Sequence, residues 1–286
     1  MRKKLIKYSL NTTRIGKEGR LYIRLAMKDG YTYIADSYGL IPLKIAKPFY
    51  LDSTGEIFLY VLNPTGGIVQ GDRYHMDVLL EPGAQAFITS QAATKVYRME
   101  CDYASATEFF EVGEGALLEY FPEPIIPFAG ARFAGEMEVK LNQGSTAFIG
   151  EVLFPGRAKR GEIFEYDFFN RKTKVFYQGE IVYYDWLDLR PKEIKPDSFG
   201  IFEGYTHYGQ LMIFSNAADR NLSDLLHVLL QNVPGIIGGA SLTWKHGIIV
   251  RALSSSGIHL TRALTECWDL ARRKLIGRSL PKIRKY

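Results

Sequence analysis

Apolar and polar residues alternate along most of the first 190 positions of the chain. The run from Leu21 to Met27 alternates, Asp29-Gly30 supplies a two-residue turn, and Tyr31 to Ala35 runs back, which predicts a β-hairpin. Strand-like runs continue at spacings of about 8–12 residues: 57–62, 74–80, 84–89, 107–112, 117–121, 133–141, 146–151, 163–170, 175–177 and 181–189. A regular βαβ rhythm is absent. We therefore expect a mainly β fold, a large stacked antiparallel β-sheet architecture that is sandwich- or helix-like in its stacking.

The pattern changes after Arg190, where prolines and glycines recur up to Gly204. Beyond this connection we expect three strands and two helices: strands 208–214, 240–244 and 247–253 and helices 222–229 and 260–275. Asp219 or Asn221 is the expected cap of the first helix, and Trp268 is expected to pack in the core. We predict a β-rich core over residues 1–190 and a C-terminal α+β portion over 191–286, packed together as one continuous domain.

Composition indicates a globular protein with a proper core, since 47% of the 286 residues are hydrophobic. The net charge of +5 is spread among interleaved acidic residues, and only the tail is clearly basic, at Lys282, Arg284 and Lys285. Because a nucleic-acid motif is absent, we expect this charge to keep the protein in solution or to attract an acidic protein partner. Cys101 and Cys267 are expected to be buried small residues. Without a signal peptide or a long apolar run, a soluble, cytoplasmic protein is expected.

The stretch from Leu62 to Arg98 organises the rest of the chain. Gly66, Gly67 and Gly71 permit a tight structural loop that presents Asp72 from a fixed frame. The Gly-x-x-x-x-Gly spacing resembles a phosphate loop, but Asp72 and Arg73 stand where a Walker loop needs Lys and Ser or Thr. A carboxylate there would repel phosphate, so we reject that interpretation.

Carboxylates in strand-like, apolar surroundings are the candidate chemistry: Asp72, Glu119, Glu151 and Asp185. Such residues are seldom buried unless they are paired or face water. One interpretation pairs each with an arginine, such as Arg73, Arg98, Arg132 or Arg157. The other places some of them along a water-filled passage for a metal ion, where dispersed carboxylates release the ion more readily than a cage of His and Cys. The five histidines are isolated and form no zinc motif: His75, His207, His227, His246 and His259.

The glycine loop and the segment after it resemble the signature of the UreD/UreH family of urease accessory proteins, which serve as nickel-insertion chaperones. That signature runs Pro-Pro-Gly-Gly-Ile/Val-Val-Gly-Gly-Asp, followed by Thr-x-x-Ala-x-Lys-x-Tyr-Arg. The residues in register are Pro64, Gly66, Gly67, Ile68, Val69, Gly71, Asp72, Thr89, Ala92 or Ala93, Lys95, Tyr97 and Arg98. Thr65 replaces the second proline, Gln70 replaces a glycine, and Asn63 stands where a histidine is common.

The resemblance implies a non-enzymatic scaffold that docks the accessory proteins UreF and UreG on the urease apoprotein and conducts Ni²⁺ through an internal tunnel. It implies no tightly bound cofactor, only Ni²⁺ in transit. Asp72, Glu151 and Asp185 match proposed carboxylates of the nickel path. The motif residues expected along the tunnel are Gln91, Thr94, Lys95, Tyr97 and Arg98.

Two other classes of function stay open at this point. A β-rich, glycosidase-like hydrolase would use two of the carboxylates across a cleft, about 5–9.5 Å apart. A nucleic-acid module would bind with a strong dependence on salt. The C-terminal helices and the basic tail are the candidate partner surface.

Overall fold

Two β-sheets face each other in the computed structural model, which describes residues 16–281. Sheet A contains, in spatial order, β14 (Glu180–Leu189), β13 (Phe168–Tyr177), β11 (Arg132–Leu141), β8 (Ala104–Val112), β5 (Arg73–Leu80), β1 (Glu18–Lys28) and β2 (Tyr31–Leu40). Sheet B contains β16 (Ile236–Leu242), β17 (Gly247–Ser254), β15 (His207–Phe214), β12 (Thr146–Leu153), β9 (Leu117–Tyr120), β6 (Gln85–Ser90), β4 (Ile57–Leu62) and β3 (Lys44–Ile45). The short strands β7 (Thr94–Val96) and β10 (Ile125–Pro127) pair with each other, and β10 also pairs with β12.

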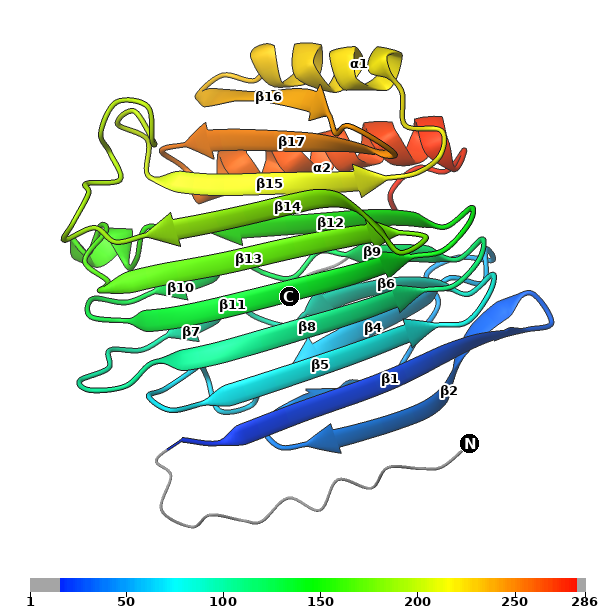
Figure 1. Ribbon diagram of the computed structural model, residues 1–286, viewed down its shortest axis with the longest axis horizontal. Coiled ribbons are helices and arrows are strands. Elements are labelled where there is room, and N and C mark those ends of the chain that lie inside the picture. The colour runs from blue at the N-terminus through cyan, green and yellow to red at the C-terminus, as the bar shows by residue number, and fades with distance from the viewer. Residues whose placement is uncertain (1–15, 282–286) are drawn as a thin grey trace.

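The middle of the chain winds between the two sheets like a solenoid (Figure 1). Strands β5, β8, β11 and β13 of sheet A alternate along the chain with β6, β9 and β12 of sheet B, so neighbours within a sheet run parallel. Antiparallel pairs occur toward the ends of both sheets, as in β1 with β2 and β13 with β14. The expected mainly β, stacked architecture is confirmed, whereas the expected antiparallel pairing is wrong for the centre of both sheets.

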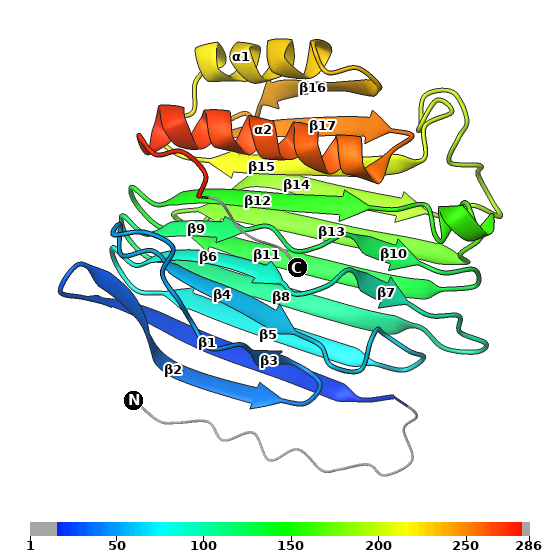
Figure 2. The same ribbon diagram turned by 180° about the vertical axis from the view of Figure 1, so that it is seen from behind.

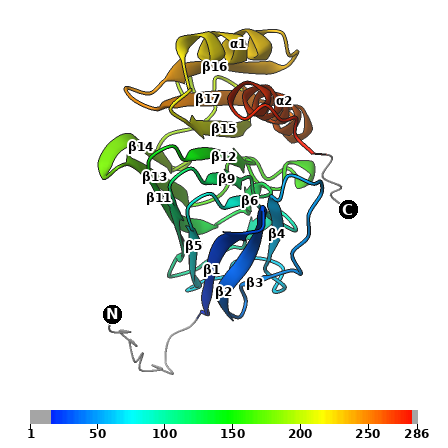
Figure 3. The same cartoon turned by 90° about the vertical axis from the view of Figure 1, so that its right-hand side faces the viewer.

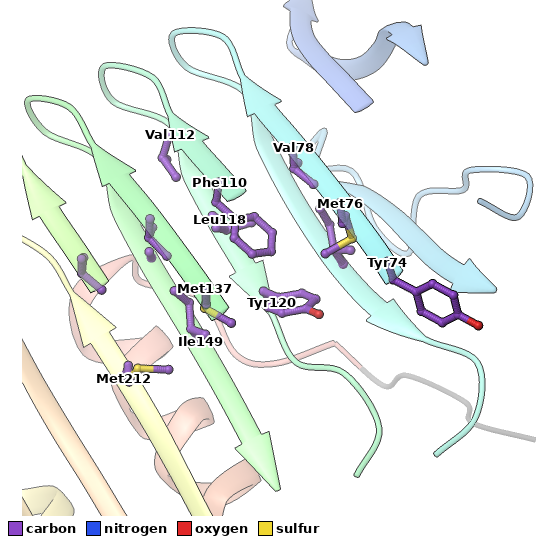
Figure 4. Packing of buried hydrophobic residues seen from close by; sticks show 14 of the residues in the cluster. Tyr74, Met76, Val78, Phe110, Val112, Leu118, Tyr120, Met137, Ile149 and Met212 are labelled. Atoms are coloured by element: carbon purple, nitrogen blue, oxygen red, sulfur yellow. The ribbon is translucent and has the colours of Figure 1, made fainter. Parts of the chain in front are cut away.

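In the parallel strands of sheet A, residues at equivalent positions are aligned from one strand to the next. Ile23, Val78, Phe110, Val139 and Val175 are aligned across five strands of sheet A, and each is at most 1% exposed. Figure 4 shows such inward side chains, among them Met76 and Met137 of sheet A and Ile149 of sheet B. The layer between the sheets is therefore a core built from aligned rows of apolar residues.

Two helices pack at one end of the stack (Figure 3). Helix α1 (Arg220–Gln231) is capped by Asp219, whose side chain accepts a hydrogen bond from the Leu222 backbone, so Asp219 is the cap of the two that were expected. Helix α2 (Gly257–Leu275) lies on the outer face of sheet B (Figure 2). Its Trp268 ring is stacked between Phe87 and Phe121, at centroid distances of 5.3 and 5.0 Å. The predicted core role of Trp268 is confirmed.

Several local expectations differ from the structure. The strand expected at 163–170 begins only at Phe168, and the 3-10 turn η1 (Ala158–Arg160) precedes it. The strand expected at 240–244 is β16, which starts at Ile236. Cys267 is buried as expected, but Cys101 is exposed, so that prediction is wrong. The basic tail residues Lys282, Arg284 and Lys285 lie outside the described residues. Within residues 16–281, no helix has the length and apolarity needed to cross a membrane.

Candidate functional site

Asp72 holds the glycine loop together from inside. Its side chain accepts hydrogen bonds from the backbone of Lys17 (2.8 Å) and Val69 (3.0 Å) and from the Tyr74 hydroxyl (2.8 Å). Asp72 is 1% exposed. Burial and this carboxylate together raise the pKa of Tyr74, which stays protonated and donates. Gly71 has a φ of +81°, the left-handed conformation that glycine adopts without strain.

The two halves of the motif lie against each other. The Ile68 amide donates to the Lys95 carbonyl (2.8 Å), and the Tyr97 amide donates to the Ile68 carbonyl (2.9 Å). Gly67 is required at this contact, because a Cβ there would lie 2.5 Å from the Tyr97 ring. Tyr97 also packs edge-on against Phe128 at 5.0 Å. The segments around Gly67 and Tyr97 therefore form one rigid surface feature.

A cavity of about 590 Å³ extends from this feature into the core. Its exposed lining residues come from the motif and the neighbouring β3: Lys44, Pro64, Gly66, Gln91, Ala92 and Lys95. Its inner lining comes from both sheets and includes Met76, Tyr120, Phe133 and Arg171, which are buried. The motif thus surrounds the open end of a cavity whose inner end lies between the sheets.

Charged groups meet at the inner end of the cavity. Arg171 on β13 donates from Nε to Glu151 on β12 (2.6 Å), and its Nη2 donates to Glu108 on β8. The Tyr120 hydroxyl donates to the second oxygen of Glu108. The side chains of Glu108, Glu151 and Arg171 are 16%, 14% and 8% exposed, so the group is largely desolvated. We call these three residues the inner charge cluster.

The titration behaviour of Arg171 follows from this arrangement. Burial by itself would lower the pKa of Arg171, but the charges of Glu108 and Glu151 outweigh it and raise the pKa. The pKa of Tyr120 is also raised, first by burial and then by Glu108. Arg171 is therefore a permanent cation, and Tyr120 a permanent neutral donor.

The polar network continues from the cluster toward the C-terminal strands. Gln210 on β15 donates to the other oxygen of Glu151 (2.7 Å) and accepts from the Tyr208 hydroxyl (3.1 Å). Farther along, Arg251 on β17 donates to Asp185 (2.7 Å) and to the Tyr183 hydroxyl (3.0 Å) on β14. Burial and Asp185 raise the pKa of Tyr183 to about 12. Arg251 and Tyr183 border a second, outer cavity of about 340 Å³.

A separate charge group lies under helix α2. Trp268 donates to Glu119 (2.5 Å), and Arg272 lies 3.2 Å from Glu119 and 3.1 Å from Glu56. Glu119 is completely buried. Its pKa is raised well above the ordinary value, first by burial and then by the charge of Glu56. This group joins α2 to sheet B and does not border the 590 Å³ cavity.

The structure brings together only part of the predicted site. Gln91, Thr94, Lys95 and Glu151 border the large cavity, whereas Asp72, Asp185, Tyr97 and Arg98 are not among its lining residues. Arg98 instead packs over Gly130: a Cβ added at Gly130 would lie 3.0 Å from Cγ of Arg98.

Pairing with an arginine is confirmed for Glu119, Glu151 and Asp185, but the expected partners are wrong. The actual partners are Arg272, Arg171 and Arg251. The arginines expected in these roles pair elsewhere: Arg73 with Asp102, Arg132 with Asp167 and Arg157 with Glu162.

Sequence reasoning missed Glu108 and Arg171. The alternation of side chains along a strand could have identified them. Glu108, for example, lies on the same face of β8 as Phe110 and Val112, which are fully buried. Among residues 16–281, no group of three or more His, Cys, Asp and Glu side chains is arranged to hold a metal ion.

Comparison with known proteins covers nearly the whole chain. A profile of the family described as "UreD urease accessory protein" matches residues 17–285. A urease accessory protein UreD of Acetivibrio thermocellus is 37% identical over 251 residues, 88% of this chain and 96% of that protein. The UreD of Lachnoclostridium phytofermentans is 32% identical over 270 residues, 94% of this chain and 98% of that protein. The chain belongs to the UreD family of urease accessory proteins.

Proposed function

We propose that this protein acts in urease maturation as a non-catalytic scaffold and metallochaperone. In this proposal it docks UreF and UreG on the urease apoprotein and conducts Ni²⁺ through its interior. Family membership supports the maturation role. The observation that supports conduction is the 590 Å³ cavity, which the family motif borders at its exposed end and Glu151 at its inner end.

The chemistry of the cavity suits a passing ion. A conduit must attract a cation yet release it, so it needs few ligands at each point and retained water. Glu151 offers carboxylate oxygens but is already bonded to Arg171 and Gln210. Neighbouring Gln91, Thr94 and Lys95 offer oxygens and a cation rather than a chelating set. Nickel would be held weakly at each point and passed on.

Asp72 and Asp185 have different roles in this proposal. Asp185 lies beyond the inner charge cluster and faces Arg251 at 2.7 Å, where it would be a later point of the path. Asp72 sits behind the loop with its oxygens occupied by three donors, where it would act through the shape of the motif. Their direct contact with nickel stays a prediction, as does a cytoplasmic location.

The glycosidase-like alternative is disfavoured by where the proton-holding carboxyl groups lie. A general acid needs a raised pKa within the substrate cleft. Burial raises the pKa of three carboxyl groups among the described residues: Glu56, Asp77 and Glu119. Glu56 and Glu119 are buried beneath α2, and none of the three lines the large cavity.

The test is urease maturation with this chain omitted. Cells would express urease and every other accessory protein at fixed nickel, and the nickel content and activity of the purified urease would be measured. We expect urease to accumulate nickel-poor and inactive until the chain is restored. Restoring it as Glu151→Gln should lower nickel content, while Glu180→Gln, an exposed carboxylate paired with Lys245, serves as the control. Normal maturation without the chain would refute the proposal.

A further inference from the structure

The inner charge cluster carries an unbalanced charge. Glu108 and Glu151 contribute two formal negative charges and Arg171 one positive charge, while Tyr120 and Gln210 are neutral donors. Unpaired charge in a desolvated place is costly. A cluster of formal charge −1 that borders a cavity therefore favours the entry of a further cation.

The space beside the cluster exists because small residues lie next to Arg171. Tyr74, Ala106, Gly135 and Arg171 are aligned on neighbouring strands of sheet A. A Cβ at Gly135 would lie 2.9 Å from Cδ of Arg171 and 3.0 Å from its Nη1. The Arg171 side chain thus lies over the glycine, and the cavity borders it.

A buried hydroxyl, that of Thr173, lies on β13 two residues after Arg171. Glu108, Met137, Thr173 and Asp185 are aligned across β8, β11, β13 and β14. Thr173 is 1% exposed, and its Oγ1 has no hydrogen-bond partner among the described residues. An unsatisfied buried oxygen between Glu108 and Asp185 is a position that a cation or its water would satisfy. Met137, between them, is flexible and polarisable.

We propose that Arg171 is a displaceable counter-cation that gates the inner end of the cavity, and that Glu108 is a further carboxylate of the cation path. At rest the guanidinium occupies Glu108 and Glu151 and prevents a divalent ion from being chelated there. An arriving divalent cation replaces it at Glu108 and moves on past Thr173 toward Asp185, and the guanidinium then returns. This inference rests on the proposed function and deepens it by naming what regulates release.

Neutralising Arg171 tests the gate directly. The full-length chain with Arg171→Gln should bind Ni²⁺, titrated alone and followed by calorimetry, at least about ten-fold more tightly than the wild type, because the competing unit charge is gone. Urease matured with this variant should contain less nickel, since the ion is retained. Arg171→Lys keeps the unit charge but cannot contact both carboxylates as the guanidinium does, so its Ni²⁺ affinity should lie between those of the wild type and Arg171→Gln. The matched control is Lys174→Gln, which removes a surface cation of the same strand paired with Glu136 and should keep the wild-type Ni²⁺ affinity.

A second variant keeps the test decisive if Arg171→Gln does not fold. Glu108→Gln leaves the pair of Arg171 with Glu151 intact and removes the excess negative charge. It should bind Ni²⁺ more weakly than the wild type and also lower the nickel content of urease. Unchanged Ni²⁺ affinity in both folded variants, with normal urease maturation, would overturn the gate. That result differs from failure of the proposed function, in which omitting the whole chain has no effect.

Discussion

The absence of a side chain at Gly150 decides how α2 meets sheet B. A Cβ at Gly150 would lie 1.9 Å from Cδ2 of Phe121. The Phe121 ring occupies that space and stacks on Trp268 with an interplanar angle of 6°. Gly150 directly precedes Glu151 on β12, so the outer face of this strand seats the helix while its inner face reaches the cavity.

Gly150→Ala should therefore destabilise the protein by overpacking. We expect a loss of about 1–3 kcal/mol in the free energy of unfolding, measured by urea titration. Adding Phe121→Leu to the same chain removes the clashing ring edge and should recover part of the loss. A Gly150→Ala protein as stable as the wild type would contradict the packing described for Phe121.

Asp72 offers a second test at the residue scale. Asp72→Ala leaves the donors of Lys17, Val69 and Tyr74 without their acceptor. We expect unfolding to become easier by about 1.5–3 kcal/mol in urea titration. The control is Asp102→Ala, an exposed carboxylate 3.4 Å from Arg73, which should cost under about 1 kcal/mol. Full stability of Asp72→Ala with poor nickel loading would instead favour direct contact of Asp72 with the ion.

At the scale of elements, helix α2 is fastened to sheet B by charges as well as by rings. Arg272 is 1% exposed and faces two carboxylates, Glu56 and Glu119, that are equally buried. Burial raises the pKa of both carboxyl groups, and the charge of Glu56 raises the pKa of Glu119 further, so the folded state holds a proton that the unfolded chain releases near pH 4.5. This attachment is strongest when that proton is present.

Stability should accordingly fall as the pH rises above 4.5, the ordinary pKa of glutamate. The folded state binds more protons than the unfolded state there, so the slope is negative, up to about 1.4 kcal/mol per pH unit for one proton. Glu119→Gln still accepts from Trp268 and should flatten the slope in urea titrations between about pH 5 and 8. Glu180→Gln, which is exposed, should keep the wild-type slope. An unchanged slope in Glu119→Gln would contradict the assignment.

Most helices and strands were predictable from the local sequence pattern. The positions where they begin and end show where that pattern is insufficient. The Asp29-Gly30 hairpin and the Asp219 cap were predicted because turn and cap chemistry is local. The early start of β16 at Ile236 was missed, since Gly238 and Gly239 weaken the strand pattern. Gly238 is there because a Cβ would lie 2.4 Å from the Arg251 carbonyl oxygen, a contact with β17 that is remote in sequence.

At the scale of the whole molecule, alternation predicted strands but not their direction. Parallel neighbours usually require a helical crossover, and its absence suggested antiparallel pairing. Here the crossover from β5 to β8 contains strands of the opposite sheet, β6 and the short β7. The same limit hid part of the site. Glu151 was predicted as a carboxylate at the end of an apolar strand and from the family resemblance, but its partner Arg171 lies on β13 of the opposite sheet, far from it in sequence.

The direction of pairing at the ends of the stack limits how far the parallel repeat extends. In the interior each turn of the solenoid pairs with the next through parallel strands. The edge of such a turn could pair with another turn, or with another molecule, and continue the winding. The hairpin partner β2 closes sheet A at one end and β14 closes it at the other, both antiparallel to their neighbours. In sheet B, β3 and β16 do the same. Within the described residues both sheets therefore end in strands that run antiparallel to their neighbours, so the parallel repeat of the interior stops inside the molecule. A second copy that paired with one of these end strands would not continue the winding.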